Sequence, residues 1–531
     1  MSVFLLCAIM LLGDAGMMTI QAAPSTGRAA NLVVIVRYQG DTVGDDDTGY
    51  NTPYTSQISG APTTYWGLLQ RRFNGENDTF AIGSFREYLS RLSGGAHQVE
   101  SLFPQTVSGE RVEYITLDKT LAEYQGSNEI SLVAEVAQKL TEKYPTYDGT
   151  LLDRDGDGAI DNLMILASVP KTGQFTPHTT NAGNNYTFAG KTIGYYNILE
   201  TCTTTLSSGT FWDSFDIATA AHEYVHTFGV PDYYRTSGMN GTPVGMWDLM
   251  AGSLGRPSLL ATTRENIGWA KIAQKTATSS TYTLYDMDSA YANGGKSQAY
   301  KFYTPFSSSE YFVVEYRKPG KKYSADLDQN MSGAGLIVYR VNPAYATDGN
   351  LRGNDYIYVF RPDDTGGNAS AGDITKAAAG MPTYISGRQS IGSEDLSKTI
   401  VDNAICYSDG RNSGMTISVT AQTDDSITFD VTFPDYANMN LWETVTSQDG
   451  TTPLSTMNAS ATQLATDGNA IYVLAQNTNS STVLQYDGAN WTNLGKPIDN
   501  VSSSVSIESC NGSLYALISD YRNNCSVLKK Y

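Results

Sequence analysis

Residues 221–234 read AHEYVHTFGVPDYY, and they constrain the fold and the chemistry of this chain more than any other stretch. His222 and His226 stand four residues apart, so on a helix both rings project from one face, close enough to bind one metal ion. Glu223 shares this surface, where it would act as a general base and not as a ligand. The chain has only 4 histidines among 531 residues, so the motif is specific. It predicts a helix that carries a catalytic zinc site.

The residues after this motif end the helix and offer candidates for a third ligand. Gly229 can adopt the left-handed conformation that closes a helix, and Pro231 prevents the helix from continuing. Asp232 can then turn back toward the two imidazoles as an oxygen ligand, which leaves a fourth position open for water. Asp248 and Glu200 are alternative carboxylate ligands, and Asp232 could instead serve only the turn.

The stretch HEYVHTFGVPD resembles the extended zinc motif HExxHxxGxx(H/D) of the metzincin clan, and more closely that of the immune inhibitor A family of secreted bacterial metallopeptidases. Two other stretches resemble segments of that family, MWDLMAGS at residues 246–253 and NIGWA at residues 266–270. Met250 matches the methionine that forms a turn under the metal in metzincins. The resemblance covers roughly residues 31–434. It implies a metzincin-like α/β catalytic domain that is followed by a β domain.

The motif and the resemblance together predict a secreted zinc-dependent endopeptidase that hydrolyses extracellular proteins or peptides. His222, His226 and Asp232 would hold the zinc ion. Glu223 would take a proton from the metal-activated water and pass it to the leaving amine. The alternative is an inactive peptidase-like scaffold that binds protein or glycan outside the cell. The complete set of two histidines and a glutamate favours the enzyme.

Length and composition limit the class of protein. A chain of 531 residues exceeds one hydrophobic core, so roughly two to four domains are expected. The net charge of -19 and the lack of Lys/Arg clusters disfavour nucleic acid as a partner, so we expect none. The apolar run at residues 3–13 is too short to span a bilayer and precedes small residues, which predicts a signal peptide over residues 1–23. No later stretch is apolar enough for a transmembrane helix. The predicted signal peptide leads us to expect an extracellular protein.

The catalytic domain is predicted over residues 28–275. Residues 31–38 (NLVVIVRY) form a continuous β-branched run, which is typical of a strand buried on both faces. Residues 84–92 open with a Ser-x-x-Glu capping box and predict a helix. Residues 129–144 have apolar side chains on one face and predict an amphipathic helix.

Residues 153–161 (DRDGDGAID) fit the first nine positions of an EF-hand-like calcium loop. The carboxylates of this loop belong to Asp153, Asp155, Asp157 and Asp161. The acid that closes the motif is missing. One interpretation is a structural calcium site completed by ligands from elsewhere, and the other is an acidic turn. We favour calcium, because four close carboxylates without a counter-ion would repel each other.

After about residue 276 the pattern changes to short strands that are separated by turns. Runs at residues 311–317 and 335–341 and the strict alternation at residues 427–433 predict an antiparallel β-sandwich over residues 276–435. In residues 436–531, the sequence DGNAIYVLAQ is followed 44 residues later by the similar NGSLYALISD. This period fits four-stranded propeller blades, so we expect a propeller-like β module, either truncated or packed on the sandwich as a small β unit.

Three residues near the zinc motif have alternative interpretations. His178 is expected to be a surface loop histidine, and its alternative role is to stabilise a transition-state oxyanion or contact substrate. Tyr233 and Tyr234 are expected to be core aromatics. For both tyrosines the alternative is a phenol that stabilises the oxyanion.

Removal of the signal peptide would leave four cysteines, an even number that permits disulfides in an exported chain. Cys510 and Cys525 are placed so that a disulfide would close a hairpin. Cys202 and Cys406 lie in different predicted domains, so we expect these two to be buried thiols.

Overall fold

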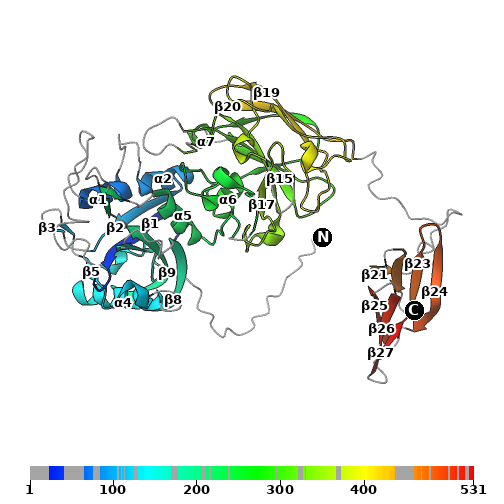
Figure 1. Cartoon of the computed structure of the whole chain (residues 1–531), viewed down its shortest axis with the longest axis horizontal. Helices are drawn as coiled ribbons and strands as arrows, with labels where there is room; N and C mark the ends of the chain where they lie inside the picture. The colour runs from blue at the N-terminus through cyan, green and yellow to red at the C-terminus, as the bar shows by residue number, and fades with distance from the viewer. Residues whose placement is uncertain are drawn as a thin grey trace, which may run out of the picture. The chain divides into compact units, whose positions relative to one another are not determined.

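The computed structural model of the chain divides into two compact units, Met1–Pro434 and Asp435–Tyr531, and each is considered by itself (Figure 1). The structure describes residues 23–40, 65–75, 84–104, 107–108, 111–112, 114–124, 129–168, 177–201, 203–205, 211–213, 217–236, 239–292, 296–320, 327–328, 330–365, 372–436, 460–467, 469–476, 480–499, 503–510, 513–520 and 525–530. Apart from Ala23, the predicted signal peptide lies outside these residues. Within them, no helix is long and apolar enough to cross a membrane.

A seven-stranded sheet forms the centre of the first part of this unit. Its strands are β1 (Gly27–Arg37), β2 (His97–Leu102), β5 (Ile115–Thr116), β6 (Ala159–Ile160), β7 (Leu163–Ser168), β8 (His178–Phe188) and β9 (Lys191–Thr201). The main order is β2-β1-β7-β9-β6; β5 pairs with β1, and β8 pairs antiparallel with β9, whereas the other pairs are parallel. In β1, eight of 11 residues are buried, which confirms the predicted strand. Two short hairpins consist of β3 (Val107–Ser108) with β4 (Arg111–Val112) and β10 (Thr203–Thr205) with β11 (Phe211–Asp213).

Helices cover both faces of the seven-stranded sheet. They are α1 (Tyr65–Asn74), α2 (Phe85–Leu92), α3 (Leu121–Tyr124), α4 (Glu129–Lys143) and α5 (Ile217–His226). Val33 of β1 lies in a core shared with α1, α2 and α5, and the next residue, Val34, lies in a core shared with α3 and α4. Because neighbouring strand residues point to opposite faces, β1 contributes to both cores. The helices predicted at residues 84–92 and 129–144 are confirmed.

Two further sheets follow within the same unit. One contains β12 (Ala273–Lys275), β14 (Ala299–Phe302), β15 (Tyr311–Arg317), β16 (Gly335–Val341) and β17 (Ile357–Val359), and the other contains β13 (Ser280–Tyr285), β18 (Ser390–Gly392), β19 (Thr416–Gln422) and β20 (Ser426–Thr432). All pairs are antiparallel except β12 with β14. Strand β20 alternates between buried and partly buried residues, as predicted. Tyr282 and Phe302 join the two sheets, with 5.7 Å between their ring centroids.

The core around α5 continues into the five-stranded sheet. Val313, Ile337 and Ile357 of that sheet belong to the same buried cluster as α5. The first residue of the short helix α6 (Ala261–Asn266) is held by strand β15. Its backbone N–H donates a 2.9 Å hydrogen bond to the buried carboxylate of Glu315, which belongs to β15. A second short helix, α7 (Met287–Ala292), follows β13. The predicted boundary between residues 275 and 276 therefore separates two patterns of secondary structure within one compact unit.

The second unit consists of two sheets built from the repeated sequence. The first contains β21 (Ser460–Thr466), β22 (Ile471–Gln476), β23 (Ser480–Tyr486) and β24 (Trp491–Asp499), and the second contains β25 (Ser503–Cys510), β26 (Ser513–Asp520) and β27 (Cys525–Lys530). Tyr472 and Leu474 of β22 face the same core as their equivalents in β26, Ala516 and Ile518. The two sheets therefore contact each other through the same face of each repeat. In a propeller, the blades are related by rotation about a central axis, and the front face of one blade packs on the back face of the next. The repeat is present, but this packing differs from that of adjacent propeller blades.

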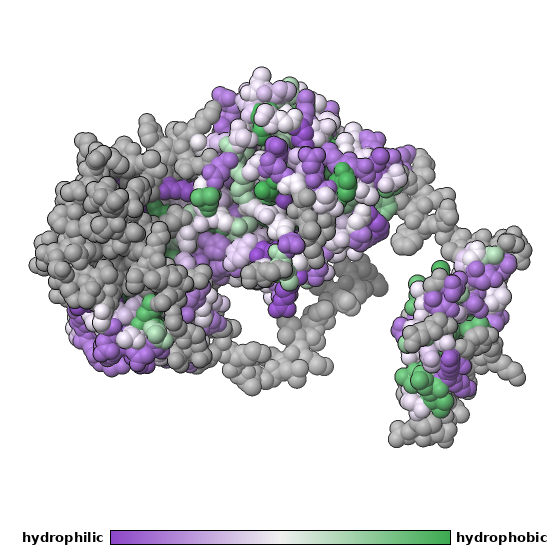
Figure 2. Space-filling model, viewed as in Figure 1, coloured by the Kyte–Doolittle hydropathy of each residue, from purple (hydrophilic) through white to green (hydrophobic). Residues whose placement is uncertain are grey.

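The surface of the second unit exposes several large apolar side chains. Leu464, Leu517, Val527 and Leu528 are all exposed, and Figure 2 shows hydrophobic residues on this unit's surface. Among the residues of this unit that the structure describes, the core that joins the two sheets has eight buried members. A unit of this size buries a smaller fraction of its surface than the larger first unit.

Cys510 is a free, exposed thiol, so the predicted disulfide with Cys525 is wrong. The strand register gives the reason, since Cys510 lies opposite the first residue of β26 and Cys525 lies opposite its last. The two ends of this strand are about 23 Å apart, far beyond the Cα separation of a disulfide. Cys406 is buried and free, as predicted, and Cys202 lies outside the described residues.

A layer of aromatic rings supports helix α5 from behind. The ring of His97 is fully buried, stacks on Trp269 with 5.6 Å between centroids, and places Nε2 3.2 Å from the Tyr224 hydroxyl. Phe228 extends the layer, 5.4 Å from the His97 ring. Burial lowers the pKa of His97 to about 4, and a hydrogen bond to the Pro24 backbone opposes part of this effect. His97 is therefore a neutral structural residue at pH 7.

The buried His97 predicts a loss of stability in mild acid. Its pKa is about 4 in the folded chain against 6.5 for the ordinary side chain, so the unfolded chain binds the proton first and stability falls as pH drops through this window. Between pH 7 and pH 4.5 the wild type should lose about 2–3 kcal/mol more free energy of unfolding than His97→Gln. Urea unfolding of both chains at the two pH values measures this difference. Equal losses in both chains would contradict the assignment.

Candidate metal centre

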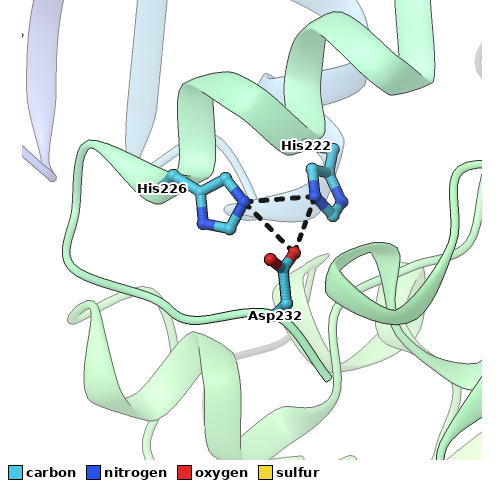
Figure 3. A group of neighbouring side chains, drawn as sticks. All are labelled: His222, His226 and Asp232. Atoms are coloured by element: carbon cyan, nitrogen blue, oxygen red, sulfur yellow. Dashed lines mark hydrogen bonds and ion pairs between the residues drawn. The ribbon is translucent and has the colours of Figure 1, made fainter. Parts of the chain in front are cut away.

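Helix α5 carries the histidines of the motif and is anchored by its rear face. Ala218, Ala221 and Val225 lie in the core beneath it, which leaves His222 and His226 on the opposite face (Figure 3). The helix ends at His226, and Gly229 follows with φ +79°, the left-handed conformation that a glycine adopts without strain. The chain then reverses direction, as the sequence predicts.

Three ligand atoms meet where the chain returns. The Nε2 atoms of His222 and His226 are 3.2 Å apart, and the Oδ1 atom of Asp232 lies 3.1 Å from the first and 3.3 Å from the second (Figure 3). Two ligands of a tetrahedral zinc ion, each at about 2.0–2.1 Å, lie about 3.3 Å from each other. The spacing and the chemistry of this donor set therefore fit zinc.

The other ring nitrogens fix the tautomers of both histidines. His222 Nδ1 lies 2.8 Å from the carbonyl oxygen of Leu249, and His226 Nδ1 lies 2.7 Å from that of Val230. Because a carbonyl oxygen only accepts, each Nδ1 carries the hydrogen and donates it. In the neutral rings both Nε2 lone pairs therefore point to the site, which is the arrangement of metal-ligating histidines.

The charges at the site favour an ionised Asp232. Burial alone would raise the pKa of this carboxyl, but without a metal ion the hydrogen bonds from protonated His222 and His226 hold it well below its usual range. For His222, burial lowers the pKa, and the hydrogen bond with Asp232 together with the charge of Glu223 raises it overall. An anionic oxygen and two imidazole nitrogens thus converge on one point.

Glu223 is buried beside this group and is held by strand β8. The hydroxyl of Thr179 lies 3.0 Å from Glu223 Oε2 and 2.6 Å from the Glu223 carbonyl oxygen, and Asn197 donates a 2.9 Å hydrogen bond to that hydroxyl. Burial raises the pKa of Glu223, although the two histidines lower it in part. Sequence reasoning missed Thr179 and Asn197, because a polar residue in a strand gives no signal of contact with a distant helix.

His178 precedes Thr179, and the structure corrects its predicted place in a surface loop. It lies in β8, half-buried, with Nε2 2.7 Å from Glu129 Oε1. Neighbouring residues of a strand point to opposite faces, so His178 faces α4 while Thr179 faces Glu223. This orientation argues against a role for His178 at the metal centre.

The two tyrosines after Asp232 differ in their surroundings. Tyr233 is a fully buried core residue, and its hydroxyl lies 3.3 Å from the hydroxyl of Thr263. Tyr234 is 43% exposed, and its ring stacks on His222 with 6.4 Å between centroids. Burial and a hydrogen bond with Asp232 raise the pKa of Tyr234, so its phenol stays protonated at the open side of the site.

A turn of 3₁₀ helix at Leu249–Ala251 contacts the residues of the metal centre. The Leu249 carbonyl holds His222, and the carbonyl of the buried Met250 accepts a 2.8 Å hydrogen bond from the Tyr233 backbone. Asp248 lies outside the metal-binding group. Its fully buried carboxylate accepts hydrogen bonds from Met250, Leu260 and Thr263, and burial raises its pKa to about 6. The side chain of Glu200 lies outside the described residues.

The acidic loop forms a second group of carboxylates, with three members and not the predicted four. Ligand atoms of Asp153, Asp155 and Asp161 lie within 4.8 Å of one another. Asp157 is outside this group, and its carboxylate accepts a 2.8 Å hydrogen bond from the Ala159 backbone. The loop offers the oxygen ligands that calcium requires.

Two features of the loop bear on its charge. Burial raises the pKa of Asp161 to about 7, although hydrogen bonds from the backbone of Ala30 and Arg154 lower it in part. The ammonium group of Lys191 lies 2.6 Å from Asp153 Oδ2 and neutralises one carboxylate. The loop therefore carries an incompletely neutralised negative charge.

Comparison with family models and with curated proteins finds no match for this chain. The assignment of a function therefore rests on the residues and their geometry. The feature that constrains it most is the group formed by His222, His226 and Asp232, with Glu223 beside it.

Proposed function

We propose that this protein is a secreted zinc-dependent endopeptidase with a metzincin-like catalytic domain, and that it hydrolyses peptide bonds in extracellular proteins. The observation that carries the proposal is the approach of His222, His226 and Asp232 to within 3.1–3.3 Å of one another. Glu223 lies next to His222 on the same helix. This is the arrangement of ligands and general base in zinc peptidases with an HExxH helix.

A zinc ion bound by these three residues would lower the pKa of a water molecule and polarise the carbonyl group of the substrate. Glu223 accepts the proton of the attacking water. The hydroxyl of Thr179 lies 3.0 Å from its Oε2 and helps to hold the carboxylate in place. Burial raises the pKa of Glu223 and makes its carboxylate a stronger base. Glu223 then donates the proton to the nitrogen of the leaving amine, and the peptide bond is cleaved.

Three protein ligands support a catalytic site over a structural one. Structural zinc sites are closed by four protein ligands, whereas catalytic sites keep one position for water or substrate. Among the described residues, the metal-binding group contains His222, His226 and Asp232 alone. The half-exposed Tyr234 beside them is consistent with a site that substrate can approach.

The general base predicts a separation of activity from metal binding. Glu223→Gln should lower kcat/KM for casein about 10²–10⁴-fold, because an amide cannot accept the proton. The variant should keep about one zinc ion per chain, since Glu223 is not a ligand. Casein hydrolysis and metal analysis measure the two effects, with the exposed Glu142→Gln as the control. Full activity of Glu223→Gln would exclude the proposed base, and a wild type that binds no zinc would exclude the metallopeptidase.

We also propose that the acidic loop binds a structural calcium ion through Asp153, Asp155 and Asp161. Calcium should raise the melting temperature of the wild type, because it neutralises carboxylates that repel each other in its absence. Asp155→Ala should lose this response, and Asp157→Ala should keep it, since Asp157 lies outside the group. Thermal unfolding with and without calcium, in zinc-containing buffer, tests both. Equal responses in the two variants would contradict the proposed ligand set.

A further inference from the structure

The residue that completes the metal centre lies on an irregular segment. Asp232 follows the end of α5 and belongs to no helix or strand, so the helix that holds His222 and His226 does not fix its position. A metal ligand must be held within a fraction of an ångström of its productive position. The contacts that hold residues 231–233 therefore decide whether three ligands are available or two.

Those contacts come from a loop that is more than 100 residues away in the sequence. The backbone N–H of Asn350 donates to the Asp232 carbonyl oxygen at 3.1 Å, and its side-chain Nδ2 donates to the Tyr233 carbonyl oxygen, also at 3.1 Å. The backbone N–H of Tyr233 also has a partner, because it donates a hydrogen bond to the carbonyl oxygen of Met250. Asn350 thus holds two consecutive carbonyls at the ligand.

Asn350 is itself held by strand β17. Its side chain is fully buried, its Oδ1 accepts a 3.1 Å hydrogen bond from the Ile357 N–H, and its Nδ2 donates a 2.8 Å bond to the Ile357 carbonyl. Because the oxygen of the Asn350 amide faces an N–H donor and its nitrogen faces two carbonyl acceptors, only one orientation of the amide satisfies all three hydrogen bonds. Ile357 lies in the core that includes α5. Asn350 therefore ties the backbone at Asp232 to that core.

Two neighbours of Asn350 make the same connection. Gly349 has φ +61°, and a Cβ atom there would come within 2.2 Å of the Asp232 carbonyl oxygen, so only glycine permits this approach. Asp355 lies in the same loop, and its carboxylate forms a buried 2.6 Å ion pair with Arg235. The loop between β16 and β17 thus contacts both ends of the segment 232–235.

We propose that Asn350 is a positioning residue of the metal centre, which places the Asp232 carboxylate for zinc binding from the β-sheet half of the first unit. The inference rests on the proposed zinc site. It implies that the strands after residue 275 take part in the metal centre and are not a separate appendage. Asn350→Ala removes the side-chain bonds to Tyr233 and Ile357 but keeps the backbone bond to Asp232, so it should loosen the hold on residues 231–233 while both histidine ligands stay on α5.

The test is the zinc affinity of Asn350→Ala, measured by competition with a chromophoric chelator. The affinity should fall about 10–100-fold, as is typical when a residue that orients a ligand is removed. The control is Asn412→Ala, because Asn412 is also buried and also makes three hydrogen bonds to backbone groups, but those groups lie at residues 393, 395 and 414. This control should lose similar thermal stability without a change in zinc affinity. Equal zinc affinity in the two variants would overturn the proposal.

A double-mutant cycle separates positioning from general destabilisation. If Asn350 acts through Asp232, Asn350→Ala should lower zinc affinity in the wild type but not in an Asp232→Ala background. The visible spectrum of the cobalt-substituted chain should likewise change with Asn350→Ala alone and not when Asp232 is already absent. Additive losses of affinity would show a merely structural role.

Gly349→Ala provides a second variant that does not remove a hydrogen bond of Asn350. Its methyl group would press on the Asp232 carbonyl, so zinc affinity should fall here too. Unchanged affinity in Gly349→Ala would also count against the proposal. A wild type that binds no zinc would instead overturn the proposed function itself, so the two failures are distinguishable.

Discussion

The metal centre depends on one contact, the approach of the ionised Asp232 carboxylate to two imidazole nitrogens at the end of α5. Neither partner reaches this position unaided. The histidines require a helix that ends at His226, and the carboxylate requires a chain that reverses at Gly229. The carbonyls of Leu249 and Val230 then orient the rings. A donor set of this kind, with hydrogen bonds on the far side of each ligand, is pre-organised for a metal ion.

The same contact depends on the core around α5, which both halves of the first unit share. The helix packs on the seven-stranded sheet, whereas the segment with Asp232 is held by the loop before β17. If these two supports moved independently, the three ligand atoms could not stay within 3.3 Å of one another. The shared core removes that freedom, because close-packed interiors move as a whole. A division of the unit at residue 275 would separate the histidines from the residue that holds their partner.

Local patterns in the sequence predict the parts of the site that are close together in the chain. The spacing of His222 and His226, the turn at Gly229 and the return of Asp232 all follow from short-range rules, as do the buried strand β1 and the alternation in β20. The contacts of Thr179 and Asn350 do not, because they join residues 44 and 117 positions apart. The free Cys510 depends on strand register, and the three carboxylates that converge in the acidic loop depend on its backbone conformation. The hydrophobic periodicity of the sequence predicts neither feature.

The most direct test of the central claim is a crystal structure of the zinc-loaded chain with anomalous diffraction at the zinc edge. The account predicts one strong anomalous peak at about 2.0–2.2 Å from Nε2 of His222, Nε2 of His226 and a carboxylate oxygen of Asp232. Glu223 should lie beside the ion without coordinating it, and a fourth position should hold a non-protein ligand. A peak elsewhere in the chain, or one that is bound by both histidines but not by Asp232, would contradict the account.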